Sequence, residues 1–140
     1  MVGEEEVWAG AELPEEETEF QVVALPPPIP KEEISKKGTL ATIKSARLAR
    51  NIYTSLGQVN RALGLIVEID DLEGEFSHLF SLDRKQITGS AGRLLAAGMK
   101  KLGIKKISNT KELQQVIKAL KGLRVRIMNR GGKLYWYPVE

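Results

Sequence analysis

The most distinctive chemistry of this 140-residue chain lies near its C-terminal end, where arginine and tyrosine alternate along the sequence. Arg124 and Arg126 precede a Gly-Gly pair, and Tyr135 and Tyr137 follow it. A turn centred on that pair, or one residue earlier, can bring Arg126 near Tyr137, and side-chain alternation then places all four side chains on one face. Such a face suits single-stranded nucleic acid, because bases stack on aromatic rings while cations follow the phosphates. Cross-strand packing of Tyr on Arg in a solvated hairpin is the alternative interpretation.

The same pairing brings Met128 near Tyr135 and adds Lys133 to the basic–aromatic face. The opposite face then carries apolar side chains that we expect in the core, namely Val125, Ile127, Leu134 and Trp136. Other basic and aromatic residues lie around the first expected strand and the loop after it. In an OB-fold, the loop between strands one and two and the loop between strands four and five border the ligand groove. The predicted nucleic-acid-binding residues are Arg47, Arg50, Tyr53, Arg61, Arg124, Arg126, Arg130, Lys133, Tyr135 and Tyr137.

Signals for catalysis or metal binding are weak in this chain. The absence of cysteine excludes disulfides, thiolate nucleophiles and cysteine-ligated metals, and the single histidine argues against a histidine metal cage. That residue, His78, falls on the inward side of its expected strand, which favours a core position. The acids over 70–75 lack calcium-loop spacing, and Gly89–Gly92 lacks the Lys-Ser/Thr of a P-loop. We therefore expect a non-catalytic protein without a metal or other cofactor.

The net charge of +3 hides a large asymmetry along the chain. Residues 1–33 contain ten Glu and one Lys, whereas residues 34–140 contain 20 Lys and Arg against eight Asp and Glu. The stretch 84–139 is more extreme, with 14 basic residues and the single acid Glu112. This asymmetry predicts an acidic tail on a body that binds something anionic, most often nucleic acid. A solvated lysine-rich surface is the alternative.

The N-terminal segment is also rich in proline, with five of the six prolines in its first 33 residues. Its glutamate run and its Pro26–Pro30 stretch oppose a long helix or a central strand. Between them, Phe20–Leu25 is apolar enough to contact a protein partner through residues 1–33. We predict an acidic, Pro-rich tail over 1–37 and a basic domain over 38–140. We see no targeting signal and no apolar run long enough for a membrane, which leads us to expect a cytoplasmic protein.

Hydrophobic periodicity predicts a mainly β protein with helices, of the α+β class. We expect strands over Thr39–Leu48, 63–69 and 76–82, with a strand end and a loop over 49–61. Two helices follow, Ser90–Leu102 and one that begins after Asn109, where Glu112 completes a capping box. The terminal hairpin comes last. This is the strand and helix order of the OB-fold, a five-stranded partly open barrel, although an open sheet backed by both helices fits equally well.

Residues 38–140 resemble the small OB-fold single-stranded-DNA-binding proteins of phages and archaeal mobile elements. The resemblance lies in the strand order, in the helix run Ser90–Leu102 plus Lys111–Leu120, and in the closing basic–aromatic hairpin. It implies non-catalytic binding of single-stranded DNA, or RNA, by a viral or mobile-element protein. Bacterial members of the wider group carry their acidic tail at the C-terminus, whereas here it is N-terminal. The rival hypothesis is an assembly subunit of a larger nucleoprotein complex, in which Phe20–Leu25 adds a strand to a partner's sheet.

Overall fold

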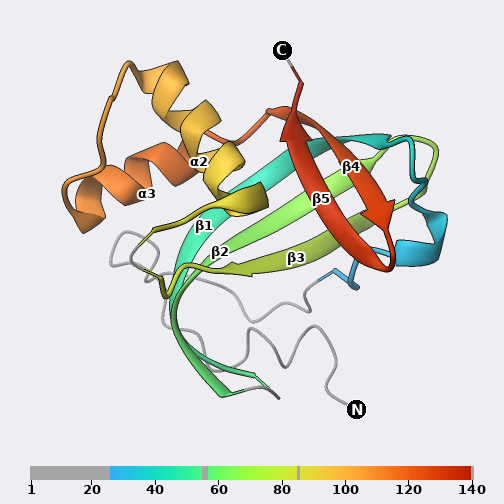
Figure 1. Cartoon of the computed structure of the whole chain (residues 1–140), viewed down its shortest axis with the longest axis horizontal. Coiled ribbons are helices and arrows are strands. Elements are labelled where there is room, and N and C mark those ends of the chain that lie inside the picture. Colours follow the sequence, from blue (N-terminus) through green and yellow to red (C-terminus); the bar gives the residue numbers. More distant parts are fainter. Residues whose placement is uncertain (1–25, 55–56, 85, 140) are drawn as a thin grey trace.

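A five-stranded antiparallel sheet and two helices make up the part of the chain that the computed structural model describes, residues 26–139 without 55–56 and 85 (Figure 1). The strands pair in the order β3-β2-β1-β4-β5. Their bounds are β1 Thr39–Thr54, β2 Gly57–Ile69, β3 Glu75–Ser81, β4 Arg124–Arg130 and β5 Lys133–Pro138. Helices α2 (Gly89–Leu102) and α3 (Thr110–Lys118) both lie between β3 and β4 in the sequence, and the 3-10 turn η2 (Lys31–Glu33) precedes β1. The expected mainly β class is confirmed, but in the described residues no ladder joins β3 to β5, so the sheet does not close into a barrel.

The first two strands form one long hairpin, and the expected loop over 49–61 is wrong. The ladder continues past Arg50, opposite Arg61, to Thr54, opposite Gly57. Figure 1 shows the far end of this hairpin extending away from the helices and the other strands. There the strands have little core to cover, so they lack the alternation that identifies a half-buried strand. We call residues 49–61 the β1–β2 arm.

The core lies between the inward face of the sheet and the two helices. Trp136 on β5 and Leu63 and Leu65 on β2 are fully buried there, as are Leu94 of α2 and Ile117 of α3. The helices approach closely at Gly98, where an added Cβ would lie 2.6 Å from the Val116 carbonyl oxygen. Only a glycine fits that contact, and the two helices therefore pack as one layer at one end of the sheet.

The start of α3 and the end of α2 follow the sequence rules. The Asn109 side chain accepts a hydrogen bond from the Glu112 amide at 2.8 Å, and the Glu112 carboxylate accepts one from the Ser108 amide at 2.9 Å. The predicted cap by Asn109 is thus confirmed, although the Glu112 carboxylate accepts from the amide one residue before the N-cap and not from that of Asn109. Helix α2 ends at Gly103, whose φ of 70° lies in the left-handed region.

Residues 26–37, which the sequence assigns to the tail, pack against the sheet. Ser77 on β3 donates from its amide to the Pro27 carbonyl at 2.8 Å and from its hydroxyl to the Pro26 carbonyl at 2.7 Å. Ile29 and Ile34 are buried in the core. The segment therefore covers part of the outer edge of β3, and core residues begin N-terminal to the expected boundary at residue 38. The apolar stretch Phe20–Leu25 lies outside the described residues.

Candidate functional site

The terminal hairpin has the pairing that the sequence predicts. Arg126 lies opposite Tyr137, and Met128 lies opposite Tyr135. The expected core residues Val125, Ile127, Leu134 and Trp136 are all buried. Around Tyr135, the Arg130 guanidinium carbon lies 5.9 Å from the ring centre and the Lys133 ammonium lies 5.6 Å from it. We call the side of β4 and β5 that carries Arg126, Arg130, Lys133, Tyr135 and Tyr137 the hairpin face.

A cation that the sequence analysis missed covers the second tyrosine of this face. The Arg93 guanidinium carbon of α2 lies 4.2 Å from the centre of the Tyr137 ring, which is a cation–π stack. Arg93 also donates from Nε to the Trp136 carbonyl at 2.8 Å and from Nη2 to the Ser90 hydroxyl at 3.2 Å. The Trp136 amide donates to the same hydroxyl at 3.0 Å. These bonds attach the first turns of α2 to the outer edge of β5, so Tyr137 has a structural partner while Tyr135 faces surface cations.

Arg124, another predicted ligand residue, bonds within the protein. Its guanidinium donates to both carboxylate oxygens of Asp70, at 2.9 and 2.8 Å, and to the Thr42 hydroxyl at 2.8 Å. The hydrogen bond lowers the pKa of Asp70 and raises the pKa of Arg124. Asp70, one of the acids that lack calcium-loop spacing, thus links the end of β2 to β4.

The remaining predicted residues lie on or beside the β1–β2 arm. Arg50 is directly opposite Arg61, and strand alternation places both on the inward side that Leu48 and Leu63 occupy two positions away. Arg47, opposite Gly64, lies on the other side of the sheet. The Arg50 Nε is buried, and no described residue forms a hydrogen bond with it. Tyr53 pairs within the ladder, but its side chain is outside the described part of the structure.

Asp83 fixes the base of the arm. Its carboxylate accepts hydrogen bonds from the Asn60 amide at 2.7 Å and from the Arg61 amide at 2.9 Å. Next to it, the Leu82 amide donates to the Arg61 carbonyl at 2.9 Å. These bonds hold Arg61 on β2 beside residues 82–83, which follow β3 and directly precede Arg84.

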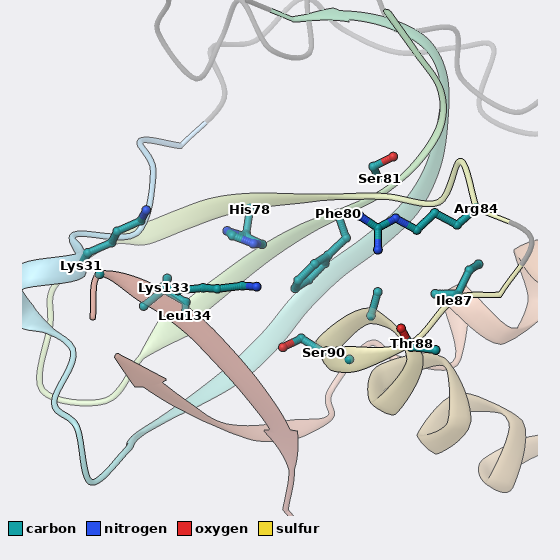
Figure 2. Close-up of a pocket in the computed structure, with 13 residues that line it drawn as sticks. Lys31, His78, Phe80, Ser81, Arg84, Ile87, Thr88, Ser90, Lys133 and Leu134 are labelled. Carbon is teal, nitrogen blue, oxygen red and sulfur yellow. The ribbon is translucent and has the colours of Figure 1, made fainter. Parts of the chain in front are cut away.

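A cavity lies between β3 and β5, where a closing ladder would run in a complete barrel. Side chains bridge the two strands there, with the ring centres of His78 and Trp136 5.1 Å apart and those of Phe80 and Trp136 5.5 Å apart. Beside these rings is a space of about 550 Å³, which we call the β3–β5 cavity (Figure 2). It is lined by Lys31, His78, Phe80, Ser81, Arg84, Ile87, Thr88, Gly89, Ser90, Ala91, Gly132, Lys133 and Leu134.

The charged residues that line this cavity are all basic. Lys31, Arg84 and Lys133 line it, and no Asp or Glu is among its described lining residues. Figure 2 shows Lys133 extending along the space toward Phe80, and Arg84 reaching in from the other end. Because opposing carboxylates are absent from this lining, the cavity favours an anionic ligand.

His78 is the one titratable ring in the cavity wall. Burial, with a smaller contribution from the nearby positive charge of Lys31, lowers its pKa from 6.5 to about 4. The imidazole is therefore neutral at pH 7, with one ring nitrogen as a donor and the other as an acceptor. The inward position that the sequence predicts for His78 is confirmed by its contacts with Phe80 and Trp136.

Lys31, Phe80 and Arg84 could not be assigned to a site from the sequence, because the cavity forms only when β3, β5 and α2 meet in three dimensions. The one available signal was Gly89–Gly92 at the start of a helix, which lies at the cavity rim. No protein-family model, curated protein or solved structure matches this chain. Within the described residues, no helix has the length and apolar character needed to cross a bilayer.

Proposed function

We propose that the protein binds single-stranded nucleic acid, with DNA preferred over RNA, and that it does so without catalysing a reaction. The observation that carries this proposal is the hairpin face, where Tyr135 lies near two surface cations, Arg130 and Lys133. An exposed base can stack on the phenol ring while the adjacent phosphates contact the two cations. Duplex DNA keeps its bases stacked inside the helix, so the same face recognises it less well.

The strand order supports an OB-like arrangement for this interface. In the OB-fold, the connections β1–β2 and β4–β5 border the groove that holds the oligonucleotide. Here the paired strands of the β1–β2 arm, which lead to and from the first connection, carry Arg50 and Arg61, and Arg130 and Lys133 flank the second connection. Both borders are therefore basic, as a groove for a polyanion requires.

The arm adds a second argument for an anionic ligand. Like charges directly opposite each other on paired strands are unfavourable, and Arg50 and Arg61 are such a pair. A phosphate between the two guanidinium groups removes the repulsion and offers an acceptor to the buried Arg50 Nε. We therefore place part of the nucleic-acid backbone along the inward side of the arm.

Replacement of Tyr135 tests the proposal. Tyr135→Ala should weaken binding of a labelled oligo(dT) by roughly five- to a hundredfold, because one stacked base contributes about 1–3 kcal/mol. Tyr135→Phe keeps the ring and should bind like the unmodified protein, as measured by fluorescence anisotropy. If the alanine variant binds with unchanged affinity while remaining folded, stacking on the hairpin face is excluded.

A further inference from the structure

We propose that the β3–β5 cavity binds one nucleoside phosphate unit, with the base in its interior and the phosphate at its cationic rim. The proposal takes its ligand class from the proposed function, but it names a second site, separate from the stacking surface of Tyr135. Its volume of about 550 Å³ falls in the usual range of small-molecule sites, roughly 300–1,000 Å³.

The interior of the cavity matches the two faces and the edge of a base. Phe80 supplies an aromatic ring, and Ile87, Ala91 and Leu134 supply apolar surface. The neutral imidazole of His78 offers both a donor and an acceptor, which suits the polar edge of a heterocycle. A phosphate alone gains nothing from this apolar wall, and an uncharged aromatic ligand gains nothing from the rim. The combination favours a ligand that has both parts.

The rim supplies the charge for one phosphate. Lys133 and Arg84 reach into the cavity from different ends, and Lys31 completes the lining on the side of His78 (Figure 2). The acid that directly precedes Arg84 in the sequence, Asp83, already accepts two backbone hydrogen bonds from the arm. Helix α2 begins at the same rim, and the positive end of its dipole adds to the attraction.

Lys133 connects the cavity to the hairpin face. Its ammonium lies 5.6 Å from the centre of the Tyr135 ring, and the same residue lines the cavity. If one base of a nucleic-acid strand stacks on Tyr135, the cavity mouth is therefore within one or two nucleotides of that base along the strand. An adjacent base can leave the stack and enter the cavity, as in other proteins that accept an extruded base.

The first experiment follows backbone amide signals of the full-length protein by NMR during titration with thymidine 5′-monophosphate, thymidine or inorganic phosphate. The nucleotide should shift the signals of residues 78–91 and 132–134 and bind at least about fivefold more tightly than either fragment. Ala91→Leu fills the interior and should abolish the difference between the nucleotide and phosphate. Ala96→Leu, an exposed change on the same helix, should leave it intact. Equal affinity for phosphate and the nucleotide in the unmodified protein overturns the proposal.

A second variant avoids any change to the core. Arg84→Gln removes a rim charge from an exposed residue and should weaken nucleotide binding at least about fivefold, while Lys121→Gln, remote from the cavity lining, should not. Indistinguishable affinities for these two variants would mean that overall charge, and not the cavity, attracts the nucleotide, and would overturn the proposal.

A third experiment, in which an oligonucleotide competes with the mononucleotide, shows whether the bound unit comes from a nucleic-acid strand or from a free nucleotide. If oligo(dT) displaces thymidine 5′-monophosphate and Ala91→Leu weakens both ligands, the unit belongs to a bound strand. If Ala91→Leu weakens only the mononucleotide, the cavity serves free nucleotides. Both results support a nucleotide site in the cavity. The same measurements also test this site independently of the proposed function. Strong oligonucleotide binding with no mononucleotide binding and no effect of Ala91→Leu would refute the cavity proposal alone, whereas mononucleotide binding without oligonucleotide binding would refute the proposed function alone.

Discussion

Acidification below pH 6.5 should destabilise the protein through His78. The folded-state pKa of about 4 lies below the ordinary value of 6.5, because burial disfavours the charged ring and Lys31 repels it. Between these two values the unfolded chain binds the proton and the folded chain does not, so stability falls as the pH falls from 6.5 to 4. One pH unit corresponds to about 1.4 kcal/mol, and the full effect is at most about 3 kcal/mol. Partial solvent access through the cavity makes the observed loss smaller.

Two measurements check this prediction. Urea unfolding between pH 7.5 and 4.5 gives the stability profile, and His78→Gln provides the control, because it keeps all carboxylates and removes the titrating ring. The variant should show a flatter profile over this range. Since the chain has a single histidine, its ring proton signals report the folded pKa without ambiguity. A midpoint near 6.5 in the folded protein, or parallel profiles for the two proteins, would refute the reasoning about the cavity wall.

Three further perturbations separate structural from ligand-binding residues. Tyr137→Ala should lower the thermal unfolding temperature, because it removes the cation–π stack with Arg93 of α2. Arg124→Gln should also lower it, because the hydrogen bonds to Asp70 are lost. An unchanged unfolding temperature in calorimetry would contradict the structural role of the residue concerned. Combined Arg50→Gln and Arg61→Gln changes should reduce the slope of log affinity against log salt by about 0.7 per lost phosphate contact, and an unchanged slope would remove the arm from the interface. Residues 1–25 contain eight Glu and no Lys or Arg, so this segment can compete with nucleic acid for the basic residues of the domain. Its deletion should therefore raise oligonucleotide affinity at low salt, and equal affinities of the truncated and full-length proteins would exclude such competition.

Local rules predicted the parts of the fold that local interactions determine. The pairing of Arg126 with Tyr137 follows from a short turn and side-chain alternation, both of which act within about ten residues. The cap at Asn109 likewise needs only the spacing to Glu112. In these elements, propensity and tertiary packing agree, so the sequence pattern is sufficient.

The predictions that the structure corrects failed for a different reason, which is that they depend on tertiary packing. The β1–β2 arm has paired strands but little core beneath them, so no hydrophobic alternation marks it. Residues 26–37 dock onto Ser77 through the backbone carbonyls of two prolines, 50 and 51 positions away along the chain, and composition alone does not reveal such bonds. The partners of Arg124 and Tyr137 are equally distant in sequence. For the candidate site, the types of residue were predictable, whereas the split between ligand-facing and internally bonded cations required the tertiary structure.

Fluorescence anisotropy across a salt series tests the central claim most directly, with labelled single-stranded DNA, its duplex and single-stranded RNA of the same sequence. We predict micromolar or tighter binding to the single DNA strand, a steep loss of affinity with salt, weaker binding to RNA and much weaker binding to the duplex. Equal affinity for all three ligands, or no binding at low salt, would contradict the proposed single-strand interface.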